Sequence, residues 1–294
     1  MRRALLGMLA AFLACTAWAV QIDVVITADN AYGFGFGDAT QMTSYFGGIR
    51  NVTAGEIFTG PPVLFAGPSV PPYTNPGVGP ERYQLTLPSV LDYVYLVAWS
   101  DKNSYQGALA GFQLPNGPLL SGTGTWQVFA TGINRNSYIE GDTLTVADLP
   151  LINSQIAIAN AEAGVAGTSI GWVDEFGMMP SNNPGVGALA LGDYNDFPGF
   201  QGVNSWIIQG ISSNSRWMWY NKNPLTFNNP FAYSGEGPGG HQEFLIFRTQ
   251  IARVLEEDAI PEPATGTLVA AGLAFAAWRR RRRASRPNGD HHDR

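Results

Sequence analysis

The stretch DYVYLVAW, residues 92–99, decides the fold class. In an extended chain, successive side chains point to opposite faces. Here both faces are apolar, with Tyr93, Tyr95, Val97 and Trp99 on one and Val94, Leu96 and Ala98 on the other. A strand that is apolar on both faces belongs inside a layered structure. The stretch therefore predicts a central strand of a two-layer, all-β sandwich.

Other parts of the chain also have strand patterns. Residues 21–28 place Ile22, Val24 and Ile26 on one face, as expected for a half-buried strand. Further strand candidates are residues 83–87, 107–112, 125–130, 205–209, 216–220 and 243–249. Segments rich in glycine and proline, such as residues 60–80 and 182–187, separate several of them and predict loops. We expect one domain built from many short strands.

One segment has helical spacing instead. Its apolar residues recur every three or four positions, at Leu149, Ile152, Ile156, Ala159 and Ala163. Asp148 precedes the segment as an N-cap, and Gly164 follows it as a terminator. The pattern predicts one substantial helix over residues 149–163, lying across an edge or end of the sandwich.

The first 19 residues have the three parts of a secretory signal peptide. Arg2 and Arg3 supply the positive charge, residues 4–16 are apolar, and Ala17 and Ala19 frame a cleavage site. We expect cleavage after Ala19 and an exported domain over residues 20–258. The single cysteine, Cys15, lies in the signal, so the exported domain would have no disulfide.

The exported part is acidic. Residues 20–260 contain 8 lysine and arginine residues against 20 aspartate and glutamate residues, a net charge of −12. Such a surface repels phosphate groups, so nucleic acid and anionic lipid head groups are not expected partners.

The stretch PEPATGTLVAAGLAFAAWRRRRR, residues 261–283, has three parts. Residues 264–278 carry no charge and would span about 22 Å as a helix, which is short for a bilayer core of roughly 30 Å. By the positive-inside rule, an arginine cluster should stay in the cytoplasm together with a polar tail over residues 284–294. The cluster consists of Arg279, Arg280, Arg281, Arg282 and Arg283. Pro261, Glu262 and Pro263 would then be extended at the outer face of the inner membrane.

This order of a PEP motif, a short apolar helix and an arginine cluster resembles the PEP-CTERM sorting domain of Gram-negative surface proteins. The resemblance implies recognition by an exosortase, processing near Pro261, Glu262 and Pro263, and transfer to the cell surface or an exopolysaccharide-rich matrix. The eleven residues after the arginines depart from the family pattern. The alternative is an ordinary tail anchor with a stop-transfer cluster.

Five stretches resemble exported PEP-CTERM proteins that have a jelly-roll-like body. They are TADNAY (residues 27–32), AWSD (98–101) with QG (106–107), and RWMWYN (216–221) with EFLIFR (243–248). An Ala-Asp-Asn-x-Tyr turn is also similar to galactose-binding-like domains. The resemblance implies a jelly-roll-like β-sandwich of carbohydrate-binding ancestry.

Catalytic signatures are scarce in the exported part. A Ser-His-Asp or zinc site needs histidine or cysteine, yet only His241 is present, and the chain has no Gly-x-Ser-x-Gly stretch. We expect no catalytic residue, cofactor or metal centre. Two alternatives are paired carboxylates of a glycoside hydrolase, at Asp174 and Glu175 or at Asp193 and Asp196, and a structural Ca²⁺ in the oxygen-rich loop 192–196.

Carbohydrate binding would need exposed aromatic faces. Trp217 and Trp219 lie two residues apart and would project from one face of a strand, as a stacking platform for sugar rings or as part of the core. The leading hypothesis is a non-enzymatic surface protein of the extracellular matrix or biofilm. The alternatives are a carbohydrate-binding module attached to exopolysaccharide and a secreted glycoside hydrolase.

Overall fold

The computed structural model describes residues 19–51, 53–65, 73–74, 79–88, 91–101, 105–164, 168–196, 207–225, 229–231 and 242–251. The chain divides into two compact units, Met1–Val254 and Leu255–Arg294, and all described residues belong to the first. Residues 1–18 and 252–294 lie outside the described residues, and with them the predicted PEP motif, apolar helix and arginine cluster. Within the described part, no helix is long and apolar enough to cross a membrane.

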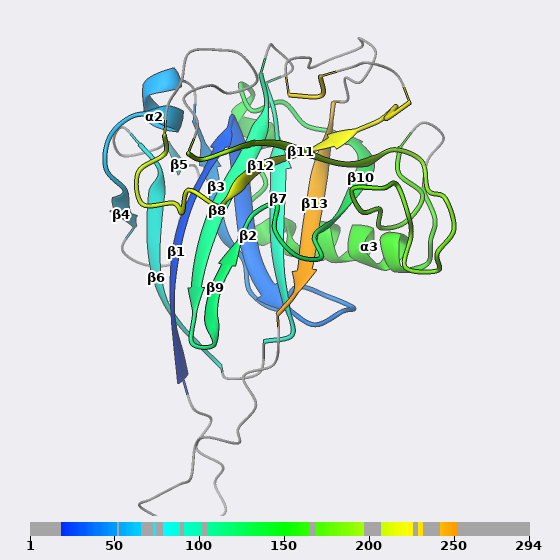
Figure 1. Cartoon of the computed structure of the whole chain (residues 1–294), viewed down its shortest axis with the longest axis horizontal. Helices are drawn as coiled ribbons and strands as arrows, with labels where there is room; N and C mark the ends of the chain where they lie inside the picture. Colours follow the sequence, from blue (N-terminus) through cyan, green and yellow to red (C-terminus); the bar gives the residue numbers. More distant parts are fainter. Residues whose placement is uncertain are drawn as a thin grey trace, which may run out of the picture. The chain divides into compact units, whose positions relative to one another are not determined.

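The described elements are mostly strands (Figure 1). The strands are β1 (Ala19–Asp29), β2 (Ala31–Gly37), β3 (Phe46–Arg50), β4 (Val63–Phe65), β5 (Tyr73–Thr74), β6 (Glu81–Pro88), β7 (Tyr93–Trp99), β8 (Gly107–Leu114), β9 (Gly117–Leu120), β10 (Gln127–Asn134), β11 (Ala188–Tyr194), β12 (Arg216–Asn221) and β13 (Glu243–Gln250). The helices are α2 (Ala54–Phe58), α3 (Leu149–Asn160) and the short 3₁₀ turns Glu140–Asp142 and Val146–Asp148.

The strands form two sheets. Sheet A has the order β11-β12-β8-β1-β6-β4, with β9 paired to β8, and sheet B has the order β10-β13-β7-β2-β3-β5. All pairs are antiparallel except β3 with β5 and β4 with β6. The prediction of an all-β two-sheet sandwich is confirmed. The predicted strand over residues 205–209 is wrong, because its described residues 207–209 form no strand. The predicted loop over residues 60–80 contains the short strands β4 and β5.

Strand β7 is central in sheet B and is buried on both faces, as predicted. Its residues Val94, Leu96 and Ala98 belong to the core between the two sheets. Tyr95, Val97 and Trp99 belong to a second core on the opposite face. This second core also contains Ile152 and Ile156 of α3, so the helix forms a third layer over sheet B.

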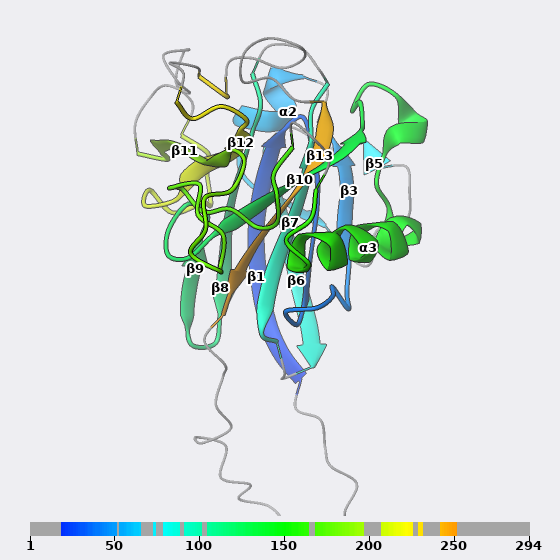
Figure 2. The same ribbon diagram turned by 90° about the vertical axis from the view of Figure 1, so that its right-hand side faces the viewer.

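The helix α3 runs across the strands of sheet B rather than along an edge or end of the sandwich (Figure 2). It ends at Asn160, three residues earlier than predicted, and Glu162 just beyond it has a left-handed φ of 52°. The carboxylate of Asp148 does not cap α3. It accepts a bond of 2.7 Å from the backbone N–H of Thr145 and so closes the preceding 3₁₀ turn.

A buried arginine connects β13 to the α3 layer. The guanidinium of Arg248 lies 4.0 Å from the ring centroid of Trp172 and 5.4 Å from that of Tyr93. It also donates to the side-chain oxygens of Asn160, at 2.8 Å, and Gln127, at 3.0 Å. Arg248 therefore joins sheet B, the helix and the segment that follows the helix.

A buried acid lies inside the sandwich. Glu81, at the start of β6, is fully buried, and its Oε2 accepts a hydrogen bond of 2.8 Å from the hydroxyl of Tyr32. The Tyr32 hydroxyl also lies 3.0 Å from that of Tyr83. Among the described residues, Glu81 Oε1 has no hydrogen-bond partner. Burial raises the pKa of Glu81 from 4.5 to about 8.

Candidate functional site

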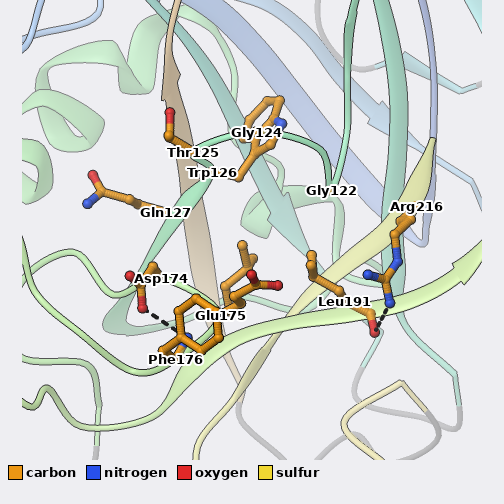
Figure 3. Close-up of a pocket in the computed structure, with 11 residues that line it drawn as sticks. Gly122, Gly124, Thr125, Trp126, Gln127, Asp174, Glu175, Phe176, Leu191 and Arg216 are labelled. Carbon is orange, nitrogen blue, oxygen red and sulfur yellow. Dashed lines mark hydrogen bonds between the residues drawn. The ribbon is translucent and has the colours of Figure 1, made fainter. Parts of the chain in front are cut away.

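A pocket of about 490 Å³ opens beside β11 and β12 (Figure 3). Its walls come from residues 122–127, the loop 174–176, β11 and the first residue of β12. These segments are far apart in the sequence, and the sheet pairings bring them together: β11 pairs with β12, and β12 pairs with β8. The pocket is therefore a product of the sandwich topology.

A tight turn shapes one wall of the pocket. The carboxylate of Asp174 accepts bonds of 2.9 Å from the backbone N–H groups of Phe176 and Met178. The Asp174 carbonyl also accepts from the N–H of Leu189, at 2.9 Å, which fixes the turn to β11. Glu175 and Phe176 stand at the tip of this turn, and the Phe176 side chain is 78% exposed. An aromatic ring is thus held open to solvent at the rim.

Arg216 lines the other side of the pocket. Its guanidinium donates to the carbonyls of Gly192, at 2.9 Å, and Leu191, at 3.3 Å, and lies 4.9 Å from the ring centroid of Tyr194. Gly122 passes so close that a Cβ there would lie 2.6 Å from the Arg216 Cβ, and its φ of +67° is left-handed. A glycine is therefore required at this wall.

The lining combines one exposed aromatic face with polar groups. Besides Phe176, it includes the exposed carboxylate of Glu175, the amide of Gln127 and the guanidinium of Arg216. Small-ligand sites place a few polar groups around apolar surface, and a ring with hydrogen-bonding groups suits the apolar face and hydroxyls of a sugar. The arrangement offers one stacking surface and several hydrogen-bonding groups to a ligand.

Of the two predicted pairs of carboxylates, one lines the pocket and the other does not. Asp174 and Glu175 both line the pocket, where the Asp174 carboxylate is already engaged by backbone N–H groups. Asp193 lies within β11, and Asp196 is exposed beyond its end. Neither Asp193 nor Asp196 lines this pocket.

The predicted loop over residues 192–196 is mostly strand. Residues 192–194 belong to β11, whose pairing with β12 shifts register between Leu191 and Tyr194. The amide of Asn195 turns inward, donating to the carbonyls of Ile208, at 2.9 Å, and Ile211, at 2.8 Å. The described residues contain no group of three or more histidine, cysteine, aspartate or glutamate side chains suited to a metal ion.

The structure does not support a sugar-stacking platform at Trp217 and Trp219. Trp217 is 3% exposed and Trp219 is fully buried, so neither indole can reach a polymer. Trp217 packs 5.9 Å from the ring of Phe58, and Trp219 packs 6.4 Å from that of Phe247 in the opposite sheet. Both fill the core, which was the alternative that the sequence offered.

Several predicted residues lie outside the described residues. They are His241, Ala17, Pro261, Glu262, Pro263, Arg279, Arg280, Arg281, Arg282 and Arg283. Ala19, the predicted last residue of the signal, is the first residue of β1. The sequence analysis did not identify Phe176, Gln127 or Arg216; an aromatic residue inside the polar turn 174–177 was the available signal for the first.

Comparisons with known proteins identify the sorting segment alone. No curated protein and no solved structure matches the chain. A family model described as the PEP-CTERM protein-sorting motif matches residues 259–283. The match includes the predicted PEP motif, apolar segment and arginine cluster, and it implies an exosortase as processing partner. The motif supports an exosortase-sorted exported protein with a membrane-anchored precursor.

Proposed function

We propose that the chain is a non-enzymatic surface protein that acts in the extracellular matrix or biofilm after sorting. The observation that carries the proposal is the sorting motif at residues 259–283 in a chain whose body is a β-sandwich. The proposal includes the signal peptide over residues 1–19, a transient transmembrane segment over residues 264–278, and a jelly-roll-like body of carbohydrate-binding ancestry. The acidic body, with a net charge of −12 over residues 20–260, disfavours nucleic acid as a partner.

Processing at both ends is the first prediction. Protein recovered from the surface fraction of the native host should begin at Val20 and end near residues 261–263, as measured by intact mass and terminal peptide mapping. Replacing the motif acid, Glu262→Ala, should leave the precursor in the inner membrane, whereas Glu257→Ala, outside the motif, should be processed normally. A wild-type chain that still ends at Arg294 in the inner membrane would contradict exosortase sorting.

Carbohydrate binding at the pocket is the second candidate function. The observation that favours it is the 78% exposed ring of Phe176 beside the exposed Glu175 at the pocket rim. An exposed ring can stack against the apolar face of a sugar without any rearrangement of the protein core. The nearby carboxylate, amide and guanidinium can form hydrogen bonds with the sugar hydroxyl groups. Since Asp174 is engaged by its own turn, we propose binding without hydrolysis.

The second prediction tests this pocket with exopolysaccharide purified from the native host. Phe176→Ala should weaken retardation in affinity electrophoresis by about tenfold in Kd, equivalent to ~1.4 kcal/mol. The matched control is Ile207→Ala, because Ile207 is 53% exposed and does not line the pocket. Equal binding by the two variants would remove the pocket as the sugar site, and release of reducing ends by the wild type would contradict a non-enzymatic role.

A further inference from the structure

A second hollow, of about 420 Å³, lies on the outer face of sheet A, where β6, β1, β8 and β9 run side by side (Figure 1). Its lining includes Asp23 and Val25 of β1, which alternate with the core residues of that strand and therefore point away from the core. It shares no lining residue with the pocket beside Phe176. We call this hollow the sheet A groove.

The floor of the groove has no side chain at one position. Gly111 of β8 pairs with Val25 of β1 on one side and with Leu120 of β9 on the other, so it lies between two apolar residues. Beyond its chain neighbours, a Cβ at Gly111 would lie 3.9 Å from its nearest heavy atoms, in Ile211 and Leu120. The space above Gly111 is therefore open, and a larger side chain there would fill it.

The segment 207–212 forms a wall of the groove and is held by the protein's own contacts. The Asn195 side chain accepts a bond of 2.8 Å from the N–H of Ile208 and donates to the carbonyls of Ile208 and Ile211, at 2.9 and 2.8 Å. Gly210 in this wall has a φ of +80°, and a Cβ there would lie 2.3 Å from the ring of Pro62. A wall that is already fixed lowers the entropy cost of binding a ligand.

The polar groups of the groove are an ion pair and an amide. The Nε–H of Arg82 donates to both carboxylate oxygens of Asp23, at 2.9 and 3.0 Å, and its Nη2 also contacts that carboxylate. The Arg82 side chain is 44% exposed and that of Asp23 31% exposed, so the pair is open to a ligand. Among the described residues, Arg82 donates to no other group, which leaves its Nη1 free. Gln113 is exposed beside Asp23, and no described residue bonds to its amide.

We propose that the sheet A groove binds a neutral polysaccharide through vicinal hydroxyl groups. The ion pair offers an acceptor and a donor side by side, so one hydroxyl of a diol can donate to Asp23 while its neighbour accepts from Arg82. The pair has no net charge and the body as a whole is acidic, so a neutral ligand fits better than an anionic one. The apolar floor suits the C–H face of a sugar ring, and Gln113 extends the polar row.

The groove is a second site, and it does not depend on the proposed pocket beside Phe176. Where both sites bind, one body holds a polymer more tightly than either site does alone, through multivalency. Only this gain in apparent affinity rests on the proposed function.

The test is affinity electrophoresis of the full chain, purified in mild detergent, in gels that contain exopolysaccharide purified from the native host. Gly111→Val should weaken retardation by about tenfold in Kd, because it fills the groove. The fold should persist, since the added Cβ meets no atom closer than 3.9 Å and valine suits a strand. Arg82→Met should weaken retardation similarly without touching the floor. Thr86→Val is the control, because Thr86 is exposed on the same face and does not line the groove.

Periodate oxidation tests the diol chemistry, because periodate cleaves vicinal diols. The Phe176→Ala variant keeps the groove, and polymer that has been oxidised with periodate and reduced with borohydride should no longer retard it. The proposal is overturned if Gly111→Val and Arg82→Met are retarded as strongly as the wild type; a loss confined to Phe176→Ala would then leave the proposed pocket standing. A loss confined to the groove variants would support the groove and remove the pocket. A concentration-dependent dimer that Gly111→Val abolishes, with retardation unchanged, would assign the face to a second copy of the chain and also overturn the proposal.

Discussion

The wild-type protein should lose a few kcal/mol of unfolding free energy between pH 4.5 and pH 8, and the Glu81→Gln variant should lose much less. Burial raises the pKa of Glu81 from 4.5 to about 8, so between these values the folded chain holds a proton that the unfolded chain has released. Stability therefore falls as the pH rises, by up to about 1.4 kcal/mol per pH unit. Below pH 4.5 both states are protonated, and this loss is absent.

Urea unfolding at pH 4.5, 6, 7 and 8 measures the difference. The glutamine amide can still accept a hydrogen bond from Tyr32. Burying its NH₂ group costs free energy, but this cost is the same at every pH. The slope of the unfolding free energy against pH is therefore diagnostic, and its absolute value is not. Glu175→Gln is the control, because Glu175 is exposed and should keep the wild-type slope. Parallel curves for the wild type and Glu81→Gln would show that Glu81 titrates as an ordinary acid in the fold.

Arg248→Met should lower the unfolding free energy by about 3 kcal/mol. The substitution keeps an apolar stem of similar length but removes charged hydrogen bonds to Gln127 and Asn160 and the stacking on Trp172 and Tyr93. Each charge-assisted bond is worth about 1.5–3 kcal/mol, and relief of the arginine's desolvation cost offsets part of the loss. The α3 layer should loosen first, because Arg248 joins it to sheet B.

Chemical unfolding and near-UV circular dichroism measure this effect, since Trp172 loses its stacked cation. The matched control is Arg82→Met, which breaks the ion pair with Asp23 in a partly exposed position. Exposed ion pairs contribute little, so this control should change stability only slightly. Equal losses in the two variants would show that burial gives Arg248 no special role.

Much of the sandwich could be predicted because its strands carry their own hydrophobic signal. Residues 92–99 were identified as a central strand since both faces are apolar, and the structure buries one face against sheet A and the other against α3. The neighbouring β2, AYGFGFG, gave no such signal because alternate positions are glycine. A Cβ at Gly33 would lie 1.9 Å from the Tyr45 hydroxyl, and one at Gly35 1.9 Å from the Ser44 carbonyl oxygen. The glycines therefore allow the segment around Ser44 and Tyr45 to pack closely on β2, and this packing cannot be predicted from the local sequence pattern.

The pocket was less predictable, because it depends on which distant segments meet. Alternation along residues 216–220 correctly placed Trp217 and Trp219 on a common face, but it could not tell whether that face is covered. Helix α2 and the opposite sheet cover it, so both indoles lie in the core. Conversely, Phe176 had no neighbours of helical or strand spacing, and only the pairing of β11 with β12 brings its turn opposite Arg216.

The outer strands of the two sheets determine how readily copies of the protein could associate edge to edge. On one side the sheets finish in short parallel strands, the three residues of β4 and the two of β5. On the other side they finish in β11 and β10, whose pairing registers shift at Leu191/Tyr194 and Ala130/Asn134. Long, regular edges template strand addition between molecules, and short or bulged ones resist it. In the described body, these four edges therefore disfavour amyloid-like polymerisation even at a high local protein concentration.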